Sequence, residues 1–112
     1  MERIVIVGYR PLPGKESELN NLMRNHWDIL NREGLVSDRK SIICRSLDGT
    51  IIEIFGWKSK EAIEQSHSNE TVQKMWTEYS KVCEFVPISS VDESLRLFSE
   101  FDPVDFDSFK NV

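Results

Sequence analysis

Ile4-Val5-Ile6-Val7 is apolar at every position, and Ile51-Ile52-Glu53-Ile54-Phe55 is apolar at every position but one. A strand with one face in water alternates apolar with polar residues, so these two runs predict strands that are covered on both faces. The rest of the chain offers only enough helix to cover one face of a sheet. We therefore expect a homodimer, in which a second copy covers the other face.

The remaining elements follow from turn residues and apolar spacing around these two runs. Two prolines and Gly14 end the first strand, and Asp48-Gly49 predicts a tight hairpin turn. We expect strands over 3–10, 39–47, 50–58 and 95–101, and helices over 15–33, 59–67 and from 69 to just before Pro87. The order β-α-β-β-α-β with right-handed crossovers predicts an α+β, ferredoxin-like fold: a four-stranded antiparallel sheet with its helices on one face.

Length and composition predict one domain over 1–104 and an acidic C-terminal tail over 105–112, with Phe106 and Phe109 spaced along it. No apolar run approaches the roughly 20 residues that span a bilayer, so no membrane partner is expected. Met1-Glu2-Arg3 leads directly into strand-like sequence instead of a secretory signal, which predicts a cytoplasmic location.

Charge and metal-binding residues exclude two further classes. The net charge is -5, and the stretch from Glu84 to Asp107 carries seven acidic residues and one basic residue, so the remainder is close to neutral. Without a basic stripe, nucleic acid is not an expected partner, and we interpret the acidic stretch as a solvated rim. Two separate histidines and two separate cysteines do not supply the three or four ligands of a metal site, and no cofactor is expected.

One stretch carries a family resemblance: Phe55-Gly56-Trp57-Lys58-Ser59-Lys60-Glu61-Ala62, followed by His67 and a helical segment with Val72, Met75 and Trp76. With these residues the chain resembles the antibiotic-biosynthesis-monooxygenase-like group of the dimeric α/β-barrel superfamily. In that group the third strand commonly ends in an aromatic residue, a serine caps the next helix, and a Glu-Ala pair and a histidine follow. The resemblance covers about residues 3–104.

The resemblance implies a homodimer whose two sheets form a central barrel, with a ligand pocket between each sheet and its own helices. Some members oxidise quinols or polyketide-derived phenols with dioxygen and without metal or flavin, and others degrade haem. The haem-degrading members use an asparagine at the end of the first strand and a tryptophan followed by a histidine. Here that strand ends in Gly8-Tyr9 and His67 precedes Trp76, so haem degradation is not expected.

Three residues are candidates for catalysis: His26, His67 and Tyr9. His26 lies in the apolar stripe of the first helix, where an imidazole suits proton abstraction from a phenol; the alternative is a buried histidine satisfied by one hydrogen bond. His67 closes the short helix and is either catalytic or a structural helix end. The Tyr9 hydroxyl either orients an oxyanion or belongs to an edge aromatic.

Six residues are candidates for substrate binding. Five are aromatic residues that either line a pocket or pack in the core: Trp27, Phe55, Trp57, Trp76 and Tyr79. The sixth, Glu53, shares a strand face with Phe55 and Trp57. A buried carboxylate needs a partner or a raised pKa, and Arg39 or Arg45 lies within reach of pairing with it, as an interface ion pair or as part of a site.

The leading hypothesis is a cofactor-independent monooxygenase that acts on a quinol or polycyclic phenol. One alternative is a non-enzymatic dimeric module that binds a small aromatic molecule, which predicts a pocket without a titratable group near the ligand. A weaker alternative is an isomerase or decarboxylase of a small lactone, which needs two polar groups flanking the cavity.

Overall fold

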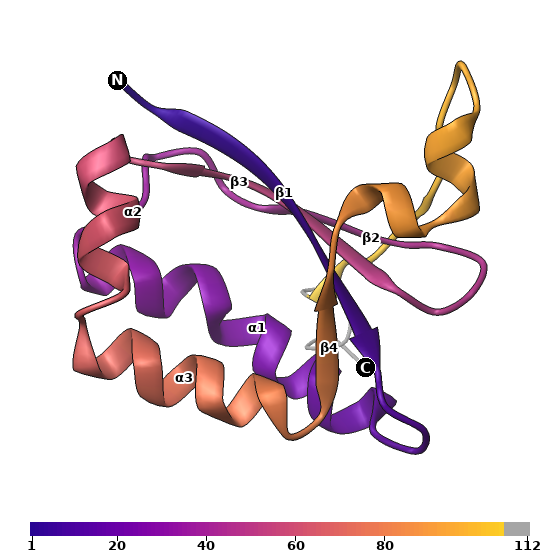
Figure 1. The fold of residues 1–112 in the computed structure, drawn as a ribbon, viewed down its shortest axis with the longest axis horizontal. Coiled ribbons are helices and arrows are strands. Elements are labelled where there is room, and N and C mark those ends of the chain that lie inside the picture. The colour runs from indigo at the N-terminus through magenta and orange to yellow at the C-terminus, as the bar shows by residue number, and fades with distance from the viewer. Residues whose placement is uncertain (107–112) are drawn as a thin grey trace.

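The computed structural model describes residues 1–106, which form one antiparallel sheet with three helices packed on a single face (Figure 1). Residues 107–112, with Phe109 and most of the predicted tail, lie outside the described part. The sheet has the strand order β4-β1-β3-β2-β5. Its strands are β1 (Arg3–Pro11), β2 (Ile42–Arg45), β3 (Ile51–Trp57), β4 (Cys83–Val86) and β5 (Asp102–Pro103). The helices are α1 (Glu16–Arg32), α2 (Lys60–Ser66) and α3 (Glu70–Ser80), and two short 3₁₀ turns, η1 (Ile88–Ser90) and η2 (Asp92–Leu95), follow β4.

The α+β class, the antiparallel sheet, the first three strands and the helices on one face agree with the sequence prediction. The sheet has five strands instead of the four that were predicted, because β5 adds to its β2 edge, and the last predicted strand was wrong. Residues 95–101 form no strand, and the strand beside β1 is β4, at Cys83–Val86. Val82 and Cys83 continue the apolar spacing of α3, so periodicity alone extends that helix too far. The helix ends at Ser80, and the Leu12 amide then binds the Val82 carbonyl at 2.8 Å, which aligns the following residues along β1.

The two helices after β3 begin at the predicted caps. The Ser59 hydroxyl accepts the Ala62 amide at 3.1 Å, and the Asn69 side chain accepts the Val72 amide at 3.0 Å. These two caps divide the helical stretch into α2 and α3, and this division brings Trp76 back over the sheet beside Trp57, with 6.5 Å between their ring centroids.

The central strands β1 and β3 present different residues to the two faces of the sheet. Val5, Val7 and Tyr9 face the helices, as do their β3 partners Phe55, Glu53 and Ile51. Ile4, Ile6 and Gly8 alternate with them and face the other side, which we call the outer face. The main core therefore lies between the helices and the inner face of the sheet.

The outer face is covered at one end and open at the other. At one end Val91, which follows η1, packs on Cys44 and Ile52 in a small second core. At the other end Ile4, Ile6 and Ile42 are 55%, 49% and 63% exposed. A single chain thus leaves an apolar sheet surface uncovered, as the continuous apolar runs predict.

At Gly8 the backbone of β1 lies close to Val86 of β4, which gives a first prediction. A Cβ atom at Gly8 would lie 2.8 Å from both the Val86 carbonyl oxygen and a Val86 methyl carbon. The carbonyl belongs to the paired strand and cannot move freely, so we expect Gly8→Ala to lower the free energy of unfolding by about 1–3 kcal/mol.

Gly56 provides the matched control, since a Cβ there meets only the ends of the flexible Glu2 and Ser37 side chains. Urea denaturation of both variants checks the prediction. Equal losses of stability for Gly8→Ala and Gly56→Ala would show that β4 does not pack this closely on β1.

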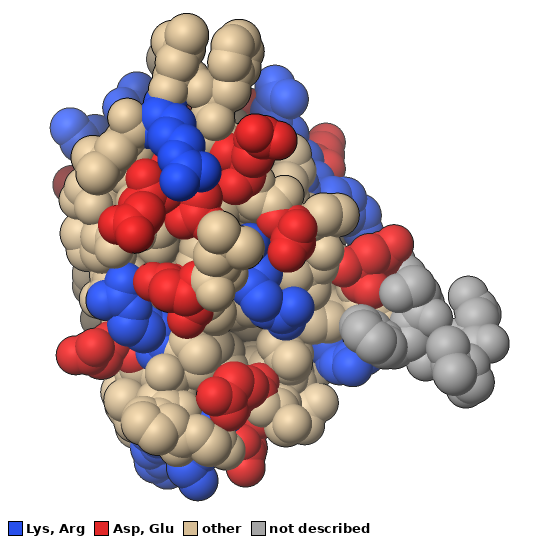
Figure 2. Space-filling view, turned by 90° about the vertical axis from the view of Figure 1, so that its right-hand side faces the viewer, with Lys and Arg blue, Asp and Glu red and all other residues tan. Residues whose placement is uncertain are grey.

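Figure 2 shows the side of the molecule that carries the β2–β3 hairpin and the turns after β4. Lysine and arginine side chains intermingle there with aspartate and glutamate, so the described residues form no continuous basic surface on this face. Within residues 1–106, no helix has the length and apolar character that crossing a bilayer requires.

Candidate active site

A cavity of about 340 Å³ lies between the inner face of the sheet and the helices. Strands, α1 and α3 all contribute to its wall, which is lined by Val5, Val7, Tyr9, His26, Phe55, Trp57, Trp76 and Phe85. Its two titratable lining residues, among those described, are Tyr9 and His26. The cavity therefore suits a flat apolar molecule that carries one or two polar groups.

Glu53 links these two polar residues at the centre of β3. The Tyr9 hydroxyl donates to Glu53 Oε1 at 2.8 Å, and His26 Nδ1 lies 2.9 Å from the same oxygen. The Ser41 hydroxyl donates to the other oxygen, Oε2, at 2.8 Å. Glu53 is only 1% exposed and His26 only 2%, so this is a buried polar cluster within an apolar core.

The surroundings of Glu53 favour its ionised form. Burial alone would raise the pKa of this carboxyl group, because a charge loses its hydration in the protein interior. The electrostatic interaction with the adjacent His26 and the hydrogen bonds from the Tyr9 and Ser41 hydroxyl groups act in the opposite direction, and together they hold the pKa of Glu53 below its ordinary value. A carboxylate is therefore present behind the cavity at neutral pH.

The His26 ring is fixed on several sides. It makes edge-on contacts with the rings of Tyr9, Phe55 and Tyr79, at centroid distances of 6.0, 5.7 and 5.4 Å. Nδ1 is close to Glu53 but is not aligned for a hydrogen bond, so the contact is mainly electrostatic. With Nδ1 held toward the carboxylate, Nε2 is the nitrogen left to exchange a proton with a ligand.

Tyr9 remains protonated in this setting. Burial is the largest effect, the charge of Glu53 adds to it, and both raise the pKa of Tyr9 well above its ordinary value. The single hydroxyl proton is already donated to Glu53. Toward a ligand the Tyr9 oxygen can thus accept a hydrogen bond. Of the two roles that the sequence left open, orienting an oxyanion would require the hydroxyl group first to leave Glu53.

The structure brings together six of the nine predicted site residues: Tyr9, His26, Glu53, Phe55, Trp57 and Trp76. The other three lie outside the cavity lining. His67 is exposed at the end of α2, with its ring 5.9 Å from that of Trp76. Trp27 borders a different cleft, where the Lys40 ammonium lies 4.6 Å from its ring, and Tyr79 is buried behind Tyr9 and His26.

The partner of Glu53 differs from the arginine expected from the sequence. Arg39 pairs instead with Glu2 at 2.9 Å, and Glu53 is satisfied by a histidine and two hydroxyl groups. The pairing with His26 joins α1 to β3 and is a tertiary contact that spacing along the chain does not reveal.

Four residues of the site were missed by the sequence reasoning: Val5, Val7, Phe85 and Ser41. The alternation of Val5 and Val7 with Tyr9 along one strand could have identified the first two. Phe85 required β4 to be placed correctly, and Ser41 carries no sequence signal. Among residues 1–106 no three His, Cys, Asp or Glu side chains come together in a way that could hold a metal ion.

Comparisons with known proteins identify the fold. No protein-family model and no curated protein matches the chain. Two solved structures are similar to it, each with a TM-score of 0.61. Rv0793 from Mycobacterium tuberculosis is 15% identical, and the match covers 77% of this chain and 91% of that one. SnoaB from Streptomyces nogalater, a cofactor-independent oxygenase, is 13% identical, with 76% and 86% covered. The family resemblance seen in the sequence is thus confirmed at the level of the fold.

Proposed function

We propose that this protein, which shares its fold with a cofactor-independent oxygenase, is itself a small monooxygenase that oxidises a quinol or polycyclic phenol with dioxygen and without metal or flavin. The observation that carries the proposal is the placement of His26 on an apolar, aromatic-walled cavity with an ionised carboxylate behind it. This arrangement pairs a positioned base with a site for a flat substrate.

The proposed reaction begins with proton transfer. His26 Nε2 takes the acidic proton of an anthrone-type phenol, and Glu53 stabilises the imidazolium that forms. The electron-rich substrate anion passes one electron to dioxygen, and the resulting radical and superoxide combine into a carbon–oxygen bond. The peroxide takes up the proton and loses water to leave a carbonyl group. One dioxygen is consumed and one water is released for each CH₂ group converted to C=O.

The aromatic wall has its own part in this scheme. Phe55, Trp57 and Trp76 offer flat apolar surfaces on which fused rings can stack, and they keep water away from the anion and the superoxide. A dry cavity protects both reactive species from protonation by solvent until they combine.

The geometry favours this reaction over the two alternatives. A binding module without turnover predicts a pocket that lacks titratable groups, whereas this cavity has both His26 and Tyr9. Lactone isomerisation or decarboxylation needs polar groups on opposite sides of the cavity, whereas His26 and Tyr9 converge on one oxygen of Glu53.

We also propose that the working form is a homodimer that pairs through the outer face of the sheet. The exposed Ile4, Ile6 and Ile42 support this, since an apolar strand surface of this kind is rarely left in water.

The proposed function predicts that purified protein accelerates oxygen uptake by an anthrone-type phenol, with quinone formed in equal amount and no loss of rate in EDTA. Binding is measured separately by quenching of tryptophan fluorescence, since Trp57 and Trp76 line the cavity. Val5→Phe fills the cavity and is expected to weaken binding about 10-fold or more, while Leu47→Phe on the exposed hairpin turn leaves it unchanged.

Two outcomes contradict the proposal. Quenching without oxygen uptake above the rate of the buffer would indicate a binding module. Uptake and quenching that are unaffected by Val5→Phe would place the reaction outside this cavity.

A further inference from the structure

The segment that begins with the last residue of η2 carries large apolar side chains in water. Leu95, Leu97 and Phe98 are 82%, 93% and 80% exposed, which makes them more exposed than the large apolar residues on the outer face of the sheet. We call residues 95–101 the apolar arm. In Figure 1 it projects from the sheet on the side opposite the helices, which is the side of the outer face.

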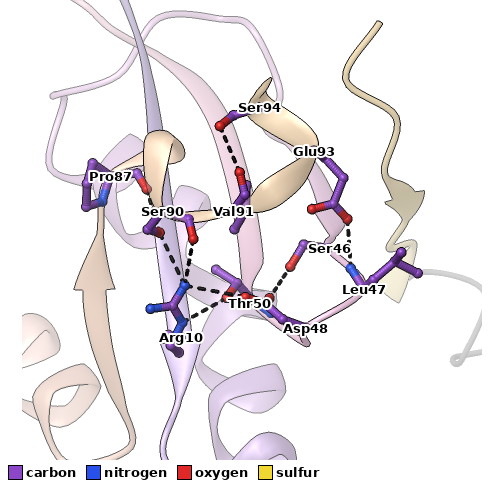
Figure 3. A network of polar contacts seen from close by, with 10 residues as sticks. All are labelled: Arg10, Ser46, Leu47, Asp48, Thr50, Pro87, Ser90, Val91, Glu93 and Ser94. Atoms are coloured by element: carbon purple, nitrogen blue, oxygen red, sulfur yellow. Dashed lines mark hydrogen bonds and ion pairs between the residues drawn. The ribbon is translucent and has the colours of Figure 1, made fainter. Parts of the chain in front are cut away.

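A network of polar contacts fixes the start of the arm (Figure 3). The Arg10 guanidinium donates to the Ser90 carbonyl at 3.2 Å and to the Thr50 hydroxyl at 3.3 Å. The Glu93 carboxylate, only 5% exposed, accepts the Leu47 amide at 2.8 Å. These bonds tie both 3₁₀ turns to β1 and to the β2–β3 hairpin.

The far end of the arm is also attached to the sheet. Asp102 and Pro103 pair with Arg45 and Cys44 of β2, and Phe101 packs against the second core. An arm held at both ends does not have the freedom of a loose terminus. Its leucines and phenylalanine are therefore held in an exposed position by attachments at both ends. Large apolar side chains that are held in this way are typical of a surface that contacts another protein.

The arm and the open half of the outer face occur on the same chain and complement each other. The chain covers one half of its own outer face with Val91 and leaves Ile4, Ile6 and Ile42 open at the other half. When two copies meet face to face about a twofold axis, each can place its arm on the open half of the other. The arm and the open half are then buried on both copies.

The size of these surfaces fits a stable pair. The exposed parts of the arm and of the open half together amount to roughly 800 Å² per protomer, which is the area that one partner contributes to a standard interface. We infer that the apolar arm crosses to a second copy of this chain and covers the open half of its outer face. This inference rests on the homodimer proposed above and names the segment that joins it.

Analytical ultracentrifugation of the full chain tests the inference. Wild-type protein is expected to sediment as a dimer at micromolar concentration. The double variant Leu97→Ser with Phe98→Ser is expected to raise the dimer dissociation constant at least about 100-fold, since two large side chains lose their burial in each arm. Leu47→Ser, at a leucine that is 87% exposed but lies on the hairpin turn, is the matched control and leaves the dimer intact.

A disulfide experiment tests the contact itself. Phe98→Cys protein is mixed with Ile42→Cys protein and oxidised, and a covalent heterodimer is expected from the mixture. The native Cys44 and Cys83 are buried and free, so they contribute little background. Far-UV circular dichroism shows whether each variant retains the fold.

The outcomes distinguish a failure of the inference about the arm from a failure of the homodimer proposal. Dimeric wild type with an unchanged dissociation constant in the arm variant, or with the same loss in Leu47→Ser, overturns the arm and leaves the homodimer standing. Wild type that remains monomeric overturns both. Neither result bears on the cavity, which fluorescence quenching examines independently.

Discussion

Glu53→Ala is expected to lower the free energy of unfolding by about 3–5 kcal/mol near pH 7, because it leaves a buried histidine and a buried tyrosine hydroxyl without their common partner. Glu53→Gln is the matched control. Its amide oxygen can still accept the Tyr9 hydroxyl, and its NH₂ group can donate to Ser41, so the hydrogen bonds remain and only the charge is lost. Urea denaturation at pH 7 should therefore give the order wild type, Glu53→Gln, Glu53→Ala, from most to least stable.

The same carboxylate makes stability depend on pH in a defined direction. The pKa of Glu53 lies below its ordinary value of 4.5 in the folded chain, so the folded state favours the ionised form. The resulting stabilisation is complete above that ordinary value and is lost as the pH falls through the lower pKa of the folded state. Wild type should lose its advantage over Glu53→Gln in that acidic range. A constant difference from pH 7 to pH 3 would show that Glu53 is not the ionised centre of the cluster.

His26→Gln is expected to reduce kcat for the oxidation of an anthrone-type phenol about 10²–10⁴-fold, which is the usual contribution of a positioned general base. Glutamine retains a hydrogen-bonding group but cannot take up the proton. Substrate binding, measured by fluorescence quenching, should change much less than kcat, because the aromatic wall that binds the rings remains.

His67→Gln serves as the control for that experiment, since His67 is exposed and lies outside the cavity lining. It is expected to leave kcat and its pH profile unchanged. Loss of activity in His67→Gln with full activity in His26→Gln would exclude His26 as the base and would move the chemistry to the end of α2.

Local patterns in the sequence predicted the parts of the fold that depend on neighbouring residues. Continuous apolar runs and turn residues placed β1 and β3, and the caps at Ser59 and Asn69 placed α2 and α3. The last strand was missed because Val82 and Cys83 satisfy helical spacing as well as they satisfy a strand. Only the pairing with β1, which is distant in the sequence, decides between the two.

The candidate site was predictable by residue type but not by its connections. Apolar surroundings marked His26 and Glu53 as unusual, yet nothing along the chain joined them, because their contact forms only when α1 packs on β3. The cluster also uses Ser41, a residue with no distinguishing neighbours. Periodicity identifies which residues lie on a face, and tertiary packing decides which of them touch.

The lining of the cavity changes along its length. Tyr9 and His26 lie beside Glu53, Phe55 follows, and Trp57 and Trp76 stand beyond it. A fused-ring molecule would consequently bind in a preferred orientation, with its hydroxyl-bearing ring beside the imidazole and its hydrocarbon rings against the indoles. Such an orientation would set the regiochemistry of the proposed oxidation, because the carbon nearest the proton acceptor would be the one that is oxidised.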